Sequence, residues 1–173
     1  MTAYAALLRA INVGGTGKLP MAELTTMCEK AGFSAVATYI QSGNVVFRSQ
    51  RGEASVKKRL EQALAERMGK PVGVHVRTRE ELEAVLENNP FSAAAPNQVV
   101  VFFLEAPLAT GALAGVEPAG GEEIVSRGRE LYVHYPLGQG KSDLKLPLQR
   151  TATGRNVNTV RKLAEMLAAL DAS

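Results

Sequence analysis

The sequence of 173 residues contains no tryptophan, one cysteine, two histidines, four tyrosines and five phenylalanines. With so few aromatic side chains, the apolar core must be built mostly from leucine, valine and alanine. The single cysteine, Cys28, leaves no second thiol for an internal disulfide, which fits a reducing compartment. An apolar fraction of 46% beside 21% charged residues still predicts a globular protein with an ordered core.

Long apolar runs are also missing. No run approaches the roughly 18 residues that a bilayer-spanning helix requires. The N-terminal stretch MTAYAALLRAINV has no basic segment before its apolar residues and carries Arg9 among them, so we expect no signal peptide. We therefore expect a cytoplasmic protein with no membrane partner.

No recognisable catalytic set is present. His75 and His134 both lie in strand-like patterns with apolar neighbours, which favours structural roles over acid–base catalysis. Cys28 lies on the apolar side of an expected helix, so we expect it in the core. Paired cysteines, clustered aspartates and His-x-x-x-His spacings are absent, and we expect neither a metal site nor a cofactor. The sequence leaves open whether the protein is an enzyme.

Charge is segregated along the chain, although the formal net charge is only +3. Residues 1–79 contain 12 Lys/Arg and 5 acids, whereas residues 80–123 contain 8 acids and no Lys/Arg. Residues 124–173 contain 8 Lys/Arg and 4 acids. This segregation predicts a basic face that attracts polyanions, or else only helices that alternate in surface charge.

Nucleic acid is the less favoured polyanion. The segment 48–79 is rich in Lys and Arg and could contact phosphates. However, sheets that bind RNA stack bases on exposed aromatic side chains, and the expected strands offer only Phe47 and Tyr4. The acidic segment 80–123 would also repel the same partner.

Hydrophobic periodicity predicts the order strand, helix, strand, strand, helix, strand in the first half, which is the ferredoxin-like order. A second, less regular set of elements follows. The first set consists of strands at 3–12, 35–40, 44–49 and 72–76, the middle two joined by a hairpin turn at Gln41–Gly43, and of helices at 20–31 and 56–68. The second set consists of a helix at 80–88, a strand at 98–106, a short helix from Pro107 to about Gly115, a hairpin at 122–136 turning at Arg127–Gly128, a short helix near 139–150 and a long helix at 155–170.

We therefore predict an α+β fold with two ferredoxin-like subdomains, the second degenerate and ending in a long C-terminal helix. The expected boundaries are 1–78 for the first subdomain, 79–97 for a helix and linker, and 98–173 for the second subdomain.

Two glycine-containing loops, INVGGTGKL and GQGKS, each follow an expected strand and precede an expected helix. Neither has the phosphate-loop spacing, because Asn12 and Tyr135 stand where the first glycine belongs. Backbone N–H groups at a helix N-terminus could still hold an anion there. Alternatively, the glycines only permit positive φ in tight turns.

Two further polar stretches, TATGRNVNTV and YIQSGNVV, resemble parts of a site. The first would put Arg155 and Asn156 in the first turn of a helix, where asparagine and a cation are locally unfavourable. Such costs are expected where a site is built, although turn chemistry alone explains the second stretch equally well. The candidate anion-binding residues are Arg9, Asn12, Gly14, Gly15, Lys18, Ser42, Asn44, Gly140, Lys141, Ser142, Arg155 and Asn156.

Six motifs together resemble the bacterial family known as domain of unknown function 1697, in order and over nearly the whole chain. They are LLRAINVGG, GKLPMAEL, TYIQSGNVVF, NNPF, LYVHYPLGQGKS and TATGRNVNTVRKLAEM. The resemblance implies an α+β fold with ferredoxin-like halves, and it implies no activity. Ala10 stands where members usually have glycine, which questions a need for close backbone approach there. Val157 stands where many have tryptophan, which suggests packing.

The leading hypothesis is an anion-binding module that recognises a phosphorylated small molecule or a nucleic-acid backbone. The competing hypothesis is a structural or protein-interaction domain without a small-molecule site. In that case the Asn, Ser and Thr side chains serve turns and helix caps. The oligomeric state does not follow from the sequence.

Overall fold

The computed structural model of the chain describes residues 1–13, 18–148 and 150–172. The chain divides into two compact units, residues 1–83 with 162–173 and residues 84–161. The end of the last helix belongs to the first unit. The expected α+β class is confirmed: each unit has a four-stranded antiparallel sheet, and the chain ends in a helix.

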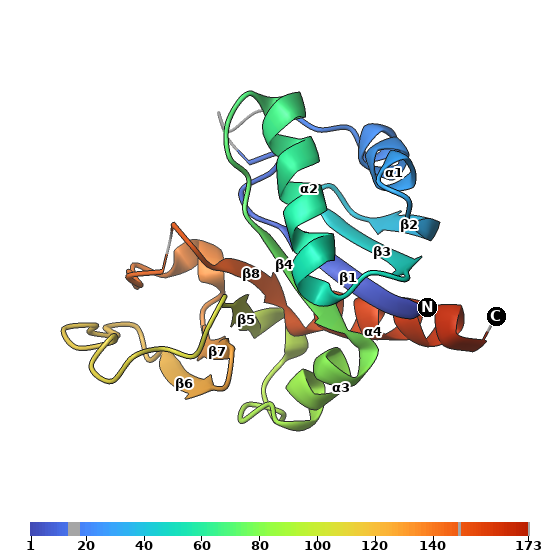
Figure 1. The fold of residues 1–173 in the computed structure, drawn as a ribbon. Helices are drawn as coiled ribbons and strands as arrows, with labels where there is room; N and C mark the ends of the chain where they lie inside the picture. Colours follow the sequence, from blue (N-terminus) through green and yellow to red (C-terminus); the bar gives the residue numbers. More distant parts are fainter. Residues whose placement is uncertain (14–17, 149, 173) are drawn as a thin grey trace. The chain divides into compact units, whose positions relative to one another are not determined.

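The first unit is built around one antiparallel sheet with the strand order β2-β3-β1-β4. Its elements are β1 (Thr2–Leu8), α1 (Met21–Lys30), β2 (Ser34–Tyr39), β3 (Asn44–Ser49), α2 (Glu53–Met68) and β4 (Val74–Thr78). The helices α1 and α2 cover one face of this sheet (Figure 1).

The core of the first unit lies between the sheet and these two helices. Val56, Leu60 and Leu64 recur every four residues on α2, so one stripe of the helix is buried. The rings of Phe33 and Phe47 stack with their centroids 4.4 Å apart. Phe47 and Tyr4 are both buried, so neither aromatic ring is exposed for base stacking.

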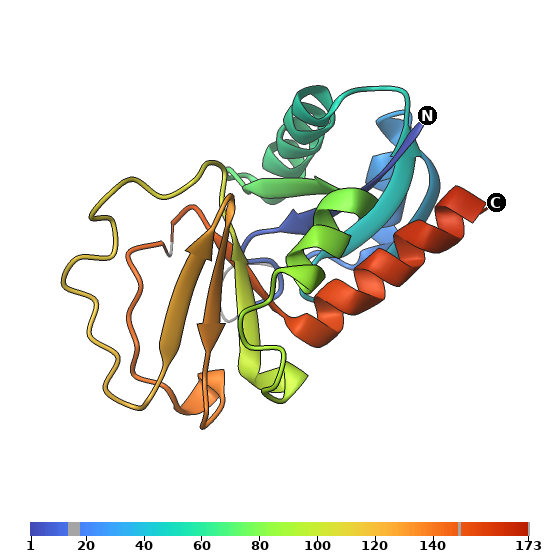
Figure 2. The same cartoon turned by 90° about the horizontal axis from the view of Figure 1, so that it is seen from below.

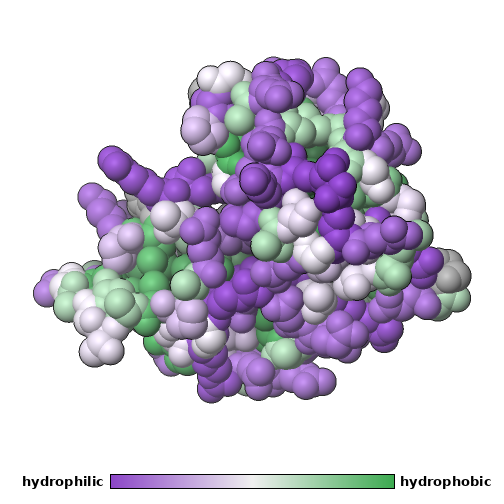
Figure 3. Space-filling model, viewed as in Figure 1, coloured by the Kyte–Doolittle hydropathy of each residue, from purple (hydrophilic) through white to green (hydrophobic). Residues whose placement is uncertain are grey.

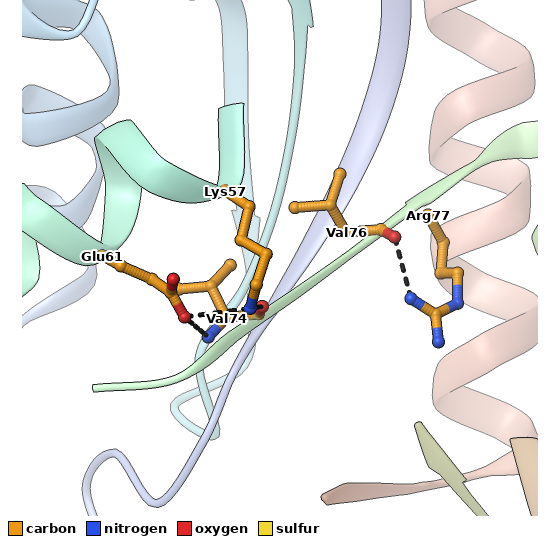
Figure 4. Close-up of polar contacts among 5 residues, drawn as sticks. All are labelled: Lys57, Glu61, Val74, Val76 and Arg77. Carbon is orange, nitrogen blue, oxygen red and sulfur yellow. Dashed lines mark hydrogen bonds and ion pairs between the residues drawn. The ribbon is translucent and has the colours of Figure 1, made fainter. Parts of the chain in front are cut away.

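β4 is an edge strand whose outward-facing backbone groups are bonded to side chains. Lys57 on α2 donates from Nζ to the carbonyl of Val74 (2.6 Å), and the N–H of Val74 donates to the carboxylate of Glu61 (3.1 Å). The same two side chains form an ion pair at 3.0 Å (Figure 4). Further along the strand, Arg77 donates from Nη1 to the carbonyl of Val76 (2.9 Å).

The second unit contains the other antiparallel sheet, with the order β6-β7-β5-β8. The boundary between the units falls inside the helices α3 and α4. The remaining elements of the chain are α3 (Arg79–Glu87), η1 (Pro96–Gln98), β5 (Val99–Phe103), β6 (Glu123–Arg127), β7 (Glu130–His134), η2 (Gln139–Lys141), β8 (Thr153–Asn156) and α4 (Val157–Ala172). Long irregular segments (yellow and orange in Figure 2) connect the strands of this unit.

One expected helix is wrong, the expected short helix near 139–150 is limited to η2 among the described residues, and the long C-terminal helix is confirmed with a later start. The segment from Pro107 to Gly115 forms separate turns, because Gly111 and Gly115 have φ of 81° and 83° and interrupt a right-handed path. The long helix begins at Val157 instead of residue 155, because residues 153–156 pair with β5 as a strand.

The two expected hairpins are confirmed. β2 and β3 pair across the turn at Gln41–Gly43. β6 and β7 pair across Gly128 and Arg129.

The central strand of each sheet pairs with its two neighbours in an equivalent register. The pair β2–β3 has an irregularity between Ser34 and Ala37 that the pair β6–β7 lacks. Ala6 on β1 lies opposite Val76 on β4, and Phe102 on β5 lies opposite Gly154 on β8. The match continues past the strand ends. In the first unit the N–H of Leu8 donates to the hairpin carbonyl of Gly43, and in the second unit the N–H of Leu104 donates to the hairpin carbonyl of Arg129, both at 2.9 Å.

Candidate functional site

Asn12 follows β1 and braces the loop that leads to α1. Its Oδ1 accepts the N–H of Leu19 (2.7 Å), and its Nδ2 donates to the carbonyls of Leu19 (3.0 Å) and Gln41 (2.8 Å). These bonds commit the side-chain amide to the backbone and tie the loop to the β2–β3 hairpin. The candidates Gly14 and Gly15 of this loop lie outside the described residues.

Ser42 and Asn44 belong to the same hairpin. Asn44 is fully buried, and its Nδ2 donates to the carbonyl of Tyr39 and to Oγ of Ser42, both at 3.0 Å. Gly43 between them has a φ of 89°, and a Cβ there would lie 3.0 Å from Cβ of Leu8. Only glycine fits this close approach without strain.

Arg9 and Lys18 complete this group at the end of β1. The N–H of Arg9 donates to the carbonyl of Gly73 (2.9 Å), and Lys18 is exposed beside the braced residue Leu19. Five of the candidates therefore meet at one end of the first sheet: Arg9, Asn12, Lys18, Ser42 and Asn44. Two of the five, Asn12 and Asn44, use their amide donors to hold turns.

The GQGKS loop belongs to the second unit, and its serine is hydrogen-bonded to a carboxylate. Ser142 donates from Oγ to Glu122 (2.7 Å), which also accepts the N–H of Gly120 (2.8 Å). These hydrogen bonds, led by the one from Ser142, lower the pKa of Glu122 below its ordinary value. Glu122 is therefore charged at neutral pH.

The cavity beside this loop has a volume of about 250 Å³. Glu117, Glu122 and Asp143 line it together with Lys141, and Gly140 is exposed nearby. Three carboxylates and one ammonium give this cavity a negative balance, which is unfavourable for an anion.

Arg155 and Asn156 lie on β8, so their expected position in the first turn of a helix is wrong. Arg155 is 7% exposed, and its Nη1 donates to Oγ1 of Thr153 (2.7 Å) and to the carbonyl of Gly154 (2.9 Å). Burial lowers the pKa of Arg155 to about 10. Asn156 accepts the N–H of Thr159 at Oδ1 (3.0 Å) and so caps α4.

A different set of cations lines a cavity of about 530 Å³ in the first unit. Lys30 at the end of α1, Arg51 after β3 and Arg59 on α2 face it, together with Ser34 and Ser49. We call this cavity the cationic pocket. No acidic side chain is among the described residues that line it.

Hydrogen bonds hold the backbone of Arg51 and the side chain of Arg59 in the cationic pocket. The N–H of Arg51 donates to Oγ of Ser49, and its carbonyl accepts the hydroxyl of Tyr4, both at 3.0 Å. Arg59 donates from Nη1 to the carbonyl of Ala31 (3.2 Å), where its charge offsets the negative end of the α1 dipole.

Three other cations of the basic segment 48–79 are paired with acids. They form ion pairs between Lys57 and Glu61 at 3.0 Å, between Arg67 and Glu23 at 2.6 Å, and between Arg79 and Glu83 at 2.6 Å. Within the described part of the chain, Lys30, Arg51 and Arg59 form no ion pair of this kind. The cationic pocket therefore concentrates uncompensated positive charge.

The sequence pattern does not single out this pocket as a site. Arg51 and Arg59 entered only as part of the basic segment, and Lys30 is an ordinary cation for the last turn of a helix. The expected ferredoxin-like order of elements could have revealed the pocket. It brings the end of the first helix and the end of the third strand to the same end of one sheet.

Comparison with known proteins identifies the family. A family model described as protein of unknown function, DUF1697, matches residues 1–132. The chain belongs to this family. In this DUF1697 chain the backbone of Ala10 has a φ of 53°. This positive φ gives a reason for the glycine that members of the family usually have at this position. Val157 is buried, as expected for a packing position.

One solved structure is similar over nearly its whole length. The conserved bacterial protein SP0830 from Streptococcus pneumoniae is 28% identical to this DUF1697 chain, with a TM-score of 0.79. The similarity covers 96% of this chain and 98% of that one. No curated protein sequence matches the chain significantly.

Three further observations concern metals, membranes and thiols. In residues 1–13, 18–148 and 150–172, no three His, Cys, Asp or Glu side chains gather as metal ligands. No helix in these same ranges has both the length and the apolar character to cross a membrane. Cys28 is buried as expected, and burial raises the pKa of its thiol to about 12.

Proposed function

We propose that this DUF1697 protein binds a phosphate-bearing ligand in the cationic pocket, where Lys30, Arg51 and Arg59 contact the phosphate. The observation that carries this proposal is the set of three cations with no acid among the described lining residues. Guanidinium and ammonium groups form charge-assisted hydrogen bonds with phosphate oxygens, and the hydroxyls of Ser34 and Ser49 can add neutral ones.

A titration with ethyl phosphate, followed by calorimetry and thermal shift, tests the proposal. Bound ligand stabilises the folded state by RT ln(1 + [L]/Kd), so melting should rise with concentration. Arg51→Gln and Arg59→Gln should each weaken binding by about tenfold or more, because a hydrogen bond to a charged group contributes about 1.5–3 kcal/mol.

Lys58→Gln is the matched control. Lys58 is exposed on α2, does not line the pocket and loses the same charge. Its Kd should equal that of the wild type. Equal affinity in the wild type and in both arginine variants would overturn the proposal.

A nucleic-acid backbone is the other source of phosphate. Since Tyr4 and Phe47 are buried, base stacking on this sheet lacks support. We expect no binding of a labelled single strand by fluorescence anisotropy at about 50 mM salt. Micromolar binding that weakens steeply by about 200 mM would instead make nucleic acid the ligand.

A second candidate function is a structural or interaction domain without a ligand. The roles of Asn12, Asn44 and Asn156 as loop brace, turn brace and helix cap favour it. Under this alternative, Asn44→Ala and Asn156→Ala each lower the free energy of unfolding by about 1 kcal/mol or more, and no phosphate compound shifts the melting temperature. The stability loss alone fits both functions, so the binding result decides.

We infer as well that both units are ferredoxin-like and that the second is a degenerate copy of the first. The βαββαβ order of the first unit supports this inference. So do the shared strand order and the shared register of the two sheets.

A further inference from the structure

A second cavity of the first unit lies between α1 and α2, and we call it the interhelix groove. Its volume is about 970 Å³, within the range of small-molecule sites. Ala22, Met27, Ala31 and Ala63 give it an apolar lining, and Met27 and Ala31 also pack on the core. Figure 3 shows apolar surface between hydrophilic side chains in the upper part of the view, where α1 and α2 lie.

The interhelix groove adjoins the cationic pocket. Lys30, Ala31 and Arg59 line both cavities. At the other end of the groove, the ion pair between Glu23 and Arg67 bridges the two helices at 2.6 Å. The two adjoining cavities therefore have positive charge at one end, apolar side chains together with Thr26 and Gln62 along the groove, and Glu66 with the Glu23–Arg67 ion pair toward the other end.

We propose that the ligand is amphipathic, a soluble phosphate monoester whose phosphate lies in the cationic pocket and whose apolar chain or ring lies in the interhelix groove. This inference rests on the proposed function and specifies its ligand class. Charge complementarity fixes the orientation, since the phosphate favours the end with Lys30 and Arg59. An apolar chain gains by leaving water along Met27 and Ala63.

A chain-length series tests the inference without any variant. Ethyl, butyl and hexyl phosphate, each kept below its micelle concentration, are titrated by calorimetry. Each buried methylene adds up to about fourfold in affinity, so hexyl phosphate should bind at least about tenfold more tightly than ethyl phosphate. Equal affinities for all three esters would overturn the amphipathic ligand and leave the phosphate site standing. If ethyl phosphate itself fails to bind, the proposed function fails instead.

Ala63→Phe fills the groove and should reduce hexyl phosphate to the affinity of ethyl phosphate, with ethyl phosphate unchanged. Ala54→Phe is the matched control, because Ala54 is exposed on the same helix and lines neither cavity. Arg59→Gln should weaken both esters by the same factor. If Ala63→Phe leaves the preference for hexyl phosphate intact, the chain does not occupy the groove.

The methyl resonance of Met27, assigned by Met27→Leu, gives a readout that does not depend on a folded Ala63→Phe variant. It should shift on addition of hexyl phosphate and remain in place with ethyl phosphate. Binding to vesicles that contain phosphatidic acid, at an affinity equal to or above that for hexyl phosphate, would replace the soluble ester with a membrane surface as the ligand.

Discussion

In the first unit two helices cover the apolar face of the sheet, whereas in the second unit irregular segments cover the same face of an equivalent sheet. Leu60 and Leu64 of α2 pack on the first sheet, and Leu104, Leu146 and Leu148 from the connections pack on the second. The strand order and the register of the central strand with its two neighbours are nevertheless equivalent in both. Strand pairing therefore defines this architecture, and helices and irregular segments are two alternative ways to shield its apolar face from water.

At one cross-strand pair the larger side chain lies on the edge strand in the first sheet and on the central strand in the second. In the first unit the small Ala6 lies opposite the larger Val76, and in the second unit the large Phe102 lies opposite Gly154. A Cβ on Gly154 would lie 2.8 Å from Cε1 of Phe102, although its φ is unexceptional. Gly154 is therefore required by packing and not by backbone conformation.

The largest expected effect comes from disturbing this pair. Gly154→Val should lower the free energy of unfolding by about 3 kcal/mol, because overpacking forces the ring of Phe102 to move. The double variant Gly154→Val/Phe102→Ala copies the first unit and should recover at least half of the loss. Urea unfolding of the two single variants and the double variant gives the coupling energy. Additive losses would show that the two pairs are not interchangeable.

Each unit also has one buried arginine at the same place on its fourth strand. Arg77 and Arg155 are 1% and 7% exposed, and each donates from Nη1 to the carbonyl of the residue before it at 2.9 Å. Such an equivalence is not expected from chance placement of a residue that is almost never fully buried.

Removing either arginine should cost about 2 kcal/mol. Arg77→Met and Arg155→Met leave the carbonyl groups of Val76 and Gly154 without a charged donor, which is the reason for the loss. Arg→Lys at each position should restore only part of the stability, since an ammonium lacks the planar fork of a guanidinium. Urea unfolding measures all four variants. A loss of stability at only one position would show that the two arginines are not energetically equivalent.

A smaller effect distinguishes the segments that follow β1 and β5. Ala10 has a φ of 53°, whereas the corresponding Ala106 has no positive φ. Ala10→Gly should raise the free energy of unfolding by about 0.5 kcal/mol, since relief of the left-handed strain exceeds the added chain entropy. Ala106→Gly, the control, should lower it by a similar amount. The opposite pattern would contradict strain at position 10.

The smallest expected effect concerns two buried groups that should not ionise while the protein is folded. Burial raises the pKa of Cys28 in the first unit and of Tyr132 in the second, each to about 12. Their contributions to stability are therefore full below the ordinary pKa values and are lost as the pH rises toward about 12. Thiol labelling and tyrosinate absorbance should report both groups only when their own unit opens. Earlier labelling of Cys28 would make the helix-covered unit the weaker one.

Much of the first unit could be predicted from the sequence, because its signals are local. Val56, Leu60 and Leu64 define α2 by their spacing, and Gly43 marks the hairpin. In the second unit β8 was missed, because a four-residue strand that contains glycine and arginine has no strand-like pattern. Its pairing with β5, about fifty residues earlier, is what makes it a strand.

The candidate site residues likewise divide into those that local sequence signals reveal and those that only the fold brings together. Polar residues in and around the glycine-containing loops were easy to find, and five of them do meet at one end of β1. Lys30, Arg51 and Arg59 come from a helix end, a strand end and a helix middle. No local pattern connects them, and only the strand order brings them to one pocket.

The bonds that Lys57 and Glu61 form with the backbone of Val74 have a consequence for the behaviour of the protein at high concentration. A free sheet edge is a template on which another chain can add a strand, which is how many proteins begin to aggregate. Here an incoming strand would first have to displace an ion pair from the peptide groups it seeks. The first sheet is thus protected against growth along β4, and screening that ion pair with salt should weaken the protection before it affects the fold.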